Sequence, residues 1–273
     1  NYRVEWASRA EGPWSDFTCT APLDYIIPTG AVMSASVPMF YRIVADYTPP
    51  GMVQIPGGTN EGTNPLAAGE SYIPDYYPAT YSLSVDFFCM DQCEVTKALW
   101  DEVYAWAITN GYTFDNAGSG KATNHPVHSV NWYDCVKWCN ARSEKEGRPA
   151  VYTVGGVVYR TGQNDDVEQA AAAGYRLPTR EEWEYAARGG AVSRRFPWSD
   201  SDEIQHARAN YESTTMFSFL SYDTSPTRGF HPTYNDGIIP YTSPAGAFAA
   251  NEYGLYDMAG NVWELCWTPG NTA

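Results

Sequence analysis

The sequence contains few positively charged residues. Only 17 of its 273 residues are Lys or Arg, against 32 Asp and Glu, which gives a formal net charge of −15. A phosphate-binding surface would have to form against this overall field, which argues against nucleic acid as a partner. The excess of acid is compatible with bound divalent cations or an extracellular setting, and equally with a solvated acidic surface.

Long apolar runs and histidine patterns are also missing. No stretch approaches the roughly 18 consecutive apolar residues that a membrane-spanning helix needs, and Asn1 does not open a signal peptide. The four histidines form no metal-binding pattern, and we interpret His125 and His128 as structural. We therefore expect no membrane span.

Six cysteines permit disulfides without requiring them. They stand at positions 19, 89, 93, 135, 139 and 266. Cys135 and Cys139 share a helical face with Trp132 and Val136, which favours burial as small apolar side chains. Cys89 and Cys93 fall on one predicted strand, on the same side. A four-thiolate zinc site from these two pairs is an open alternative, although neither pair has the Cys-x-x-Cys spacing of known zinc ribbons.

Residues 1–48 have the pattern of the end of a β-rich module followed by a linker. YRVEW at 2–6 and MFYRIV at 39–44 alternate like strands, and the segment ends in Thr48, Pro49 and Pro50. About 45 residues seldom form an independent core. We therefore expect the natural N-terminus, with any export signal, to lie upstream, and a second domain to occupy residues 49–273.

The second domain has three predicted helices and long loops. One helix follows Thr96 as N-cap; the second covers about 132–145 and stops before Gly147. The third follows Thr179, which forms a capping box with Glu182, and ends at Gly189. The loops of this domain between residues 190 and 253 show little hydrophobic periodicity, and bound ions are one means of holding such loops in place.

The stretch GLYDMAGNVWE, residues 254–264, is a candidate cation loop. Asp257 and Glu264 can offer side-chain oxygens, while the carbonyls of Gly260 and Val262 turn inward between them, which suits a hard cation such as Ca²⁺. The alternative is a turn capped by Asp257, with Trp263 packed in the core.

Several segments, in one order, resemble the formylglycine-generating enzyme family, also called sulfatase-modifying factor domains. They are GMVQIPGG (51–58), FFCMDQCEVTKALW (87–100), NHPVHSVNWYDCVKWCNA (124–141), GYRLPTREEWEYAARGG (174–190), ARANY (207–211) and the loop at 254–264. The resemblance implies an irregular α+β fold related to C-type lectins, with low regular secondary structure and structural Ca²⁺.

The resemblance also implies two calcium positions. The first uses Asp257, Gly260, Val262 and Glu264, although the family usually has Asn in place of Asp257. The second takes side chains from Asn210 and Asp236 and carbonyls from Tyr211 and Ile238. The spacing after Asp236 departs slightly from the family pattern.

Catalysis in the family depends on a pair of cysteines near the C-terminus. These thiolates hold Cu(I), and O₂ oxidises the cysteine of a Cys-x-Pro-x-Arg segment in sulfatases to formylglycine. The present chain ends in TPGNTA and lacks the Arg-Gly-Gly-Ser stretch that precedes the pair; Cys266 stands where the family often has an aromatic or a structural cysteine. We therefore expect a C-terminally truncated domain that makes no formylglycine by itself and binds copper only if the pair follows.

Two functions remain open at this point. The first is the sulfatase-modifying oxidase, represented by a fragment. The second is a non-catalytic binding module for protein or carbohydrate, with aromatic side chains available for stacking. In either case we expect a bacterial-type protein that is secreted or part of the cell envelope.

Overall fold

The computed structural model describes residues 2–7, 15–16, 40–45, 48–66, 70–71, 78–170, 173–214 and 221–267. The chain divides into two units, residues 1–50 and residues 51–273. Cys19 lies outside the described residues. None of the helices in the described ranges is both long and apolar enough to cross a membrane.

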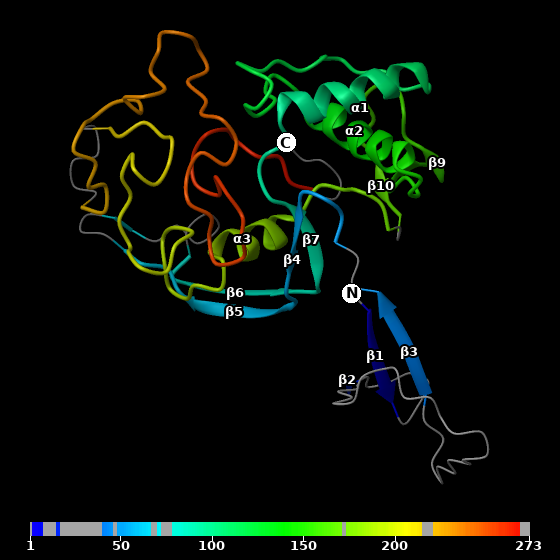
Figure 1. Ribbon diagram of the computed structural model, residues 1–273, viewed down its shortest axis with the longest axis horizontal. Coiled ribbons are helices and arrows are strands. Elements are labelled where there is room, and N and C mark those ends of the chain that lie inside the picture. Colours follow the sequence, from blue (N-terminus) through cyan, green and yellow to red (C-terminus); the bar gives the residue numbers. More distant parts are fainter. Residues whose placement is uncertain are drawn as a thin grey trace, which may run out of the picture. The chain divides into compact units, whose positions relative to one another are not determined.

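The first unit contains a small antiparallel sheet (Figure 1). Its central strand β1 (Tyr2–Ala7) pairs with β2 (Ser15–Asp16) on one side and β3 (Phe40–Ala45) on the other. Strands therefore occur where alternation predicted them, within one residue at each end. The interpretation of this unit as the end of a larger module stays a prediction.

The second unit begins with two short antiparallel pairs of strands. β4 (Met52–Ile55) pairs with β7 (Phe88–Asp91), and β5 (Gly58–Thr63) pairs with β6 (Thr80–Val85). Alternate residues of β6 are buried, and helix α3 (Arg180–Arg188) packs against this strand. The resulting core cluster includes Ile55, Leu83, Tyr185, Ala186 and Leu255.

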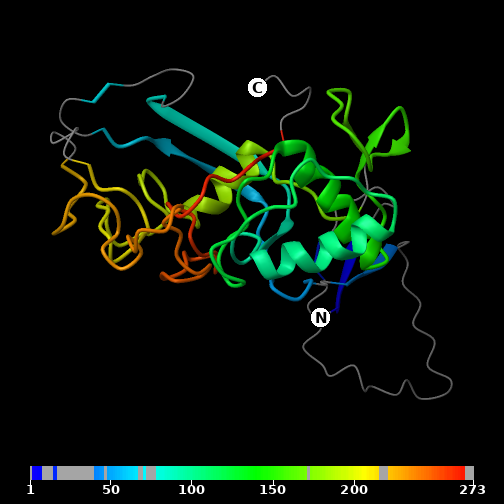
Figure 2. The ribbon, with the colours of Figure 1, turned by 90° about the horizontal axis from the view of Figure 1, so that it is seen from above.

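A second core cluster forms around two neighbouring helices. Figures 1 and 2 show α1 (Lys97–Thr109) beside α2 (Trp132–Lys145). Trp100 and Trp138 stack between them with ring centroids 5.4 Å apart. Next to α2 lies a three-stranded sheet in the order β10 (Glu168–Gln169), β8 (Tyr152–Val154), β9 (Val157–Val158). The buried Asn140 amide ties α2 to β8, because it bonds the backbone of Val151 and Tyr152.

All three predicted helices are confirmed, together with two of their caps. Thr96 caps α1, and Thr179 and Glu182 form the reciprocal capping box of α3, with distances of 2.8 and 3.1 Å. Gly189 ends α3 in the left-handed conformation, with φ 55°. α2 begins with a capping box of Asn131 and Asp134 that the sequence analysis did not identify.

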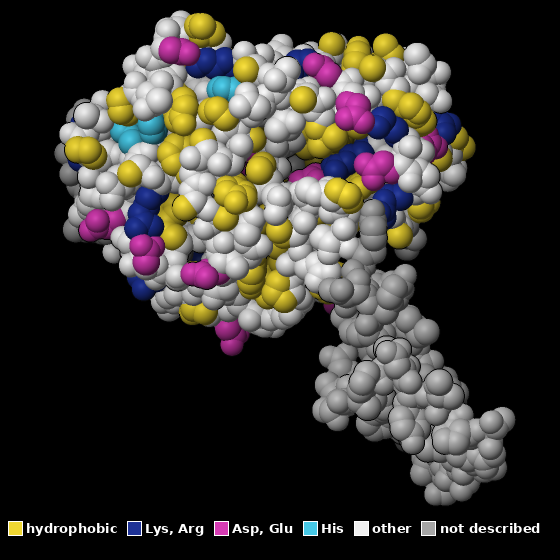
Figure 3. Space-filling view, viewed as in Figure 1, with side chains coloured by type: hydrophobic (Ala, Val, Ile, Leu, Met, Phe, Trp, Pro, Cys, Tyr) yellow, Lys and Arg dark blue, Asp and Glu magenta, His cyan; other side chains and the backbone are white. Residues whose placement is uncertain are grey.

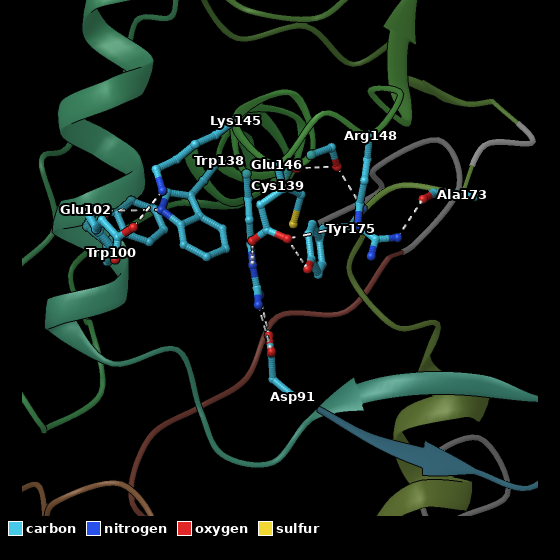
Figure 4. A network of polar contacts seen from close by, with 12 residues as sticks. Asp91, Trp100, Glu102, Trp138, Cys139, Lys145, Glu146, Arg148, Ala173 and Tyr175 are labelled. Atoms are coloured by element: carbon cyan, nitrogen blue, oxygen red, sulfur yellow. Dashed lines mark hydrogen bonds and ion pairs between the residues drawn. The ribbon is translucent and has the colours of Figure 1, made fainter. Parts of the chain in front are cut away.

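An ion pair joins α2 to the end of β7. Arg142 donates to both carboxylate oxygens of Asp91, at 2.6 and 3.0 Å. Its guanidinium lies 3.9 Å from the centroid of the Tyr175 ring. Figure 4 shows Asp91, Trp138 and Tyr175 in this network. The contact fixes β7 just before the segment that enters the candidate site.

The segment from residue 190 to residue 253 contains no helix or strand in its described parts. Side-chain hydrogen bonds hold it instead: Asp223, for example, accepts from the Tyr211 hydroxyl and from Ser213 Oγ, each at 2.7 Å.

On the face of the molecule drawn in Figure 3, Lys and Arg side chains lie among Asp and Glu.

Candidate cation site

The predicted cation loop bends through left-handed backbone. Asp257 and Asn261 have φ values of 54° and 61°, and Gly260 has 91°. Asp and Asn tolerate this region because their short polar side chains can form local hydrogen bonds. At Gly260 a Cβ would lie 2.3 Å from the carbonyl oxygen of Asn210, to which Asn261 N–H donates at 2.7 Å. The turn is thereby clamped against Asn210.

Asp257 places a carboxylate in the interior of this turn. The residue is 7% exposed, and its Oδ2 accepts a hydrogen bond from the backbone N–H of Gly246. Its Oδ1 is buried and has no hydrogen-bond partner among the described residues. Burial raises the pKa of Asp257, and the Gly246 N–H partly opposes the shift. A buried carboxylate oxygen without a partner is unfavourable unless a proton or a cation compensates it.

Glu94 supplies a second carboxylate, which the sequence analysis missed. It follows β7, and its Oε2 accepts from Asn261 Nδ2 at 2.9 Å. Its Oε1 is buried and unpartnered within the described ranges. Burial, and then the charges of Asp257 and Glu264, raise the pKa of Glu94 to about 9, while hydrogen bonds from Asn261 and from the Val262 backbone oppose the shift. No local pattern marks Glu94, because its partners come from the far end of the chain.

Glu264 supplies the third carboxylate. Its Oε2 accepts from the indole N–H of Trp183, on α3, at 2.9 Å. The residue as a whole keeps an exposed surface, yet desolvation of its carboxyl, followed by the charge of Asp257, raises its pKa to about 7. Trp263, the residue before it, is 100% exposed, so the alternative in which Trp263 packs in the core is wrong.

Buried carboxylate oxygens of this kind are the ligands that a hard divalent cation prefers. Asp257 Oδ1 and Glu94 Oε1 are buried and have no hydrogen-bond partner among the described residues. The charge of Asp257 raises the pKa of Glu94 and of Glu264, and the charge of Glu264 also raises the pKa of Glu94. No group of three or more His, Cys, Asp or Glu in the described part of the chain is placed to hold a metal ion, so Glu94, Asp257 and Glu264 do not together form a three-carboxylate site. A cation at this loop would need backbone carbonyls and water for part of its coordination, as Ca²⁺ takes in proteins.

In the second predicted calcium position, the side chains of Asn210 and Asp236 bind different partners. Asn210 is buried and donates to the Tyr241 carbonyl at 2.8 Å, whereas Asp236 is exposed and pairs with Lys121 at 2.6 Å. This pair lowers the pKa of Asp236. Ile238 is also exposed, and Tyr211 is partly buried. The second position stays a prediction, and a cation there would have to displace Lys121.

The described cysteines are poor thiolate donors. Burial raises the pKa of Cys93 and Cys266 to about 11 and that of Cys139 to about 12, and it also raises the pKa of Cys89 and Cys135. Cys139 is buried in the helix core as predicted, and Cys135 packs against the same cluster. The strand β7 ends at Asp91, so Cys93 is not on it with Cys89. The four-thiolate zinc alternative is not assembled among these residues.

Comparison with known proteins decides the family. The family model of the sulfatase-modifying factor enzyme 1-like domain matches residues 42–272. The chain belongs to this family. It is 32% identical over 206 residues to the chaperone protein LppX of Paenibacillus barcinonensis, and the matched region covers 70% of this chain and 68% of that protein. It is 31% identical over 235 residues to the formylglycine-generating enzyme of Thermomonospora curvata, with coverages of 79% and 70%.

A solved structure supports the fold assignment. The crystal structure of CarF is similar with a TM-score of 0.55 and 26% identity, over 77% of each chain. The family resemblance and the mixed fold with little regular secondary structure are confirmed.

Proposed function

We propose that this sulfatase-modifying-type domain binds a polypeptide and that its irregular loops are fixed by calcium, with a first ion held by Asp257 and Glu264 of the loop at 254–264, next to Glu94. The observation that carries the calcium proposal is the pair of buried, unpartnered oxygens, Glu94 Oε1 and Asp257 Oδ1. Carbonyls of Gly260 and Val262 would complete the ligands. When bound, the ion supplies charge compensation and joins the segment after β7 to the loop at 254–264.

Three further assignments belong to the same proposal. The scaffold is a relative of C-type lectins, the second calcium position involves Asn210 and Asp236, and the protein works outside the cytoplasm, where calcium modules of modest affinity are common. Family membership supports the first of these, and the acidic composition is compatible with the last.

A polypeptide partner is supported by what the relatives are named for. The family is described by its action on sulfatases, and LppX is named as a chaperone. Next to the site, Trp263 and Leu265 expose 100% and 39% of their surface, which offers apolar area to such a partner. We therefore favour a sulfatase-type or other protein over a carbohydrate.

The calcium proposal is tested by thermal unfolding in Ca²⁺ and in EGTA. A ligand at a hundredfold excess over Kd stabilises by about 2.7 kcal/mol, which for a domain of this size raises the midpoint by about 5–11 °C. Asp257→Ala should remove most of the difference. Identical melting curves for the wild type in the two buffers contradict the proposal.

The oxidase is the second candidate, favoured by the likeness to the Thermomonospora curvata enzyme across most of this chain. Against it, Cys139 belongs to the packed helix core and Cys135 packs against the same cluster. The test is incubation of the chain with Cu(I), O₂, a thiol reductant and a Cys-x-Pro-x-Arg peptide, followed by mass spectrometry. We expect no aldehyde above a metal-only blank, and turnover would assign the enzyme class instead.

A further inference from the structure

The three carboxylates of the site share one arrangement. In each, one oxygen accepts a hydrogen bond from an N–H donor. Asn261 Nδ2 donates to Glu94, Gly246 N to Asp257, and Trp183 Nε1 to Glu264. The second oxygen of Glu94 and of Asp257 is left without a partner among the described residues. Donors of this kind fix the orientation of metal-binding carboxylates.

Trp183 differs from the other two donors in its origin. Gly246 and Asn261 belong to the segment that carries the loop itself, whereas Trp183 lies on α3, 81 residues before Glu264. Its ring packs against the core cluster that contains Tyr185 and Leu255. The helix is fixed at both ends, by the capping box at Thr179 and by Gly189. The indole N–H is therefore held by a rigid element.

The chain around Glu264 needs such a support. Trp263 is fully exposed and gives the segment no packing. Beyond Glu264, Trp267 N–H donates to the Pro178 carbonyl at 2.7 Å, and Trp267 bridges Thr179 in parallel. The start of α3 and residues 264–267 thus run side by side, and the Trp183 indole donates to the Glu264 side chain in this arrangement.

We propose that Trp183 is a positioning residue for the cation site, because its indole N–H holds Glu264 Oε2 and thereby fixes the orientation of a carboxylate that would bind the ion. The inference rests on the calcium proposal and deepens it. It makes α3 part of the apparatus that sets cation affinity, although α3 supplies no ligand. Loss of an outer-shell partner typically lowers metal affinity about 10–100-fold.

The experiment compares three chains: wild type, Trp183→Phe and Trp263→Phe. The last is the matched control, since it removes an indole one residue from Glu264 that has no packing role. Calcium affinity is measured by titration calorimetry. Sensitised Tb³⁺ emission, excited at the tryptophan band, then reports which indole lies beside the ion. We expect Trp183→Phe to weaken Ca²⁺ binding about tenfold and to lose most of the Tb³⁺ emission at saturation. Trp263→Phe should change affinity less than about twofold and keep the emission.

Several outcomes separate the two proposals. A wild-type chain that binds neither Ca²⁺ nor Tb³⁺ overturns the cation site itself. A wild type that binds while Trp183→Phe binds equally well overturns only the positioning role. Thr179→Ala weakens α3 but keeps the Trp183 indole, so it should leave the calcium affinity unchanged. A loss of calcium affinity equal to that of Trp183→Phe would show that the stability of the helix, and not the indole N–H, is responsible. If Trp183→Phe does not fold, Trp263→Phe still decides, because emission lost in that variant contradicts the proposal.

Discussion

The Arg142–Asp91 pair allows a sharp test of how the fold supports the site. Arg142 has a side chain only 6% exposed, and its partner Asp91 is 26% exposed. Replacing one member of a buried pair leaves an uncompensated charge, which costs about 3–5 kcal/mol. The Tyr175 ring and Glu146, 3.6 Å from Arg142 Nε, remain in the variant. We therefore expect Asp91→Asn to lower the free energy of unfolding by about 3 kcal/mol, at the lower end of that range.

The same helix offers the control. Lys145 pairs with Glu102 at 2.6 Å, but the Glu102 side chain is 63% exposed. An exposed pair contributes about 0–1 kcal/mol, so Glu102→Gln should be nearly neutral. Urea unfolding at unchanged m-value measures both variants. Asp91 also ends β7 shortly before Glu94, so Asp91→Asn should weaken calcium binding as well. Equal and small losses in the two variants refute the reasoning.

Three further predictions follow from the same geometry. The pKa of Glu94 is raised to about 9 and that of Glu264 to about 7, so the cation-free folded state holds more protons than the unfolded chain above about pH 4.5. The stability of the folded state in EGTA should therefore fall as pH rises from about 4.5 to 9, and Ca²⁺ should reduce this fall. Urea midpoints in EGTA that stay constant across this pH range would contradict the prediction. Thr179→Ala should cost about 1 kcal/mol and Arg180→Ala almost nothing, and equal denaturant midpoints would show that the cap is misplaced. Asp236→Ala should remove a second, independent calcium-binding event; calorimetry showing unchanged stoichiometry rejects the second position.

Local features of the fold were predictable from sequence. Thr179 and Glu182 stand three residues apart and satisfy each other's backbone donors, so their capping box needs no tertiary information. The Gly189 exit likewise follows from one residue's freedom at positive φ. Asp257 and Glu264 lie in one short stretch of sequence, so both could be named as candidate ligands, and their role as ligands stays a prediction.

Contacts between distant segments were not predictable in the same way. Glu94 and Asn261 are 167 residues apart, and nothing near Glu94 in sequence indicates that bond. The orientation of Trp263 also depends on a contact between distant segments, the bond between Trp183 and Glu264. Its neighbour Glu264 turns toward Trp183, and Trp263 points outward from the segment. For Asp236, the sequence could not show that Lys121 would pair with the carboxylate.

A cation held by Asp257 and Glu264, next to Glu94, is the central proposal for this protein. Titration calorimetry of the chelator-treated chain with CaCl₂ at neutral pH tests it most directly, with Glu94→Gln and Asp257→Ala measured alongside. We predict a saturable binding event in the wild type that both substitutions weaken at least about tenfold, since each removes a negative charge beside the ion. Calcium binding that is undiminished in both variants, or absent from the wild type, would contradict the account.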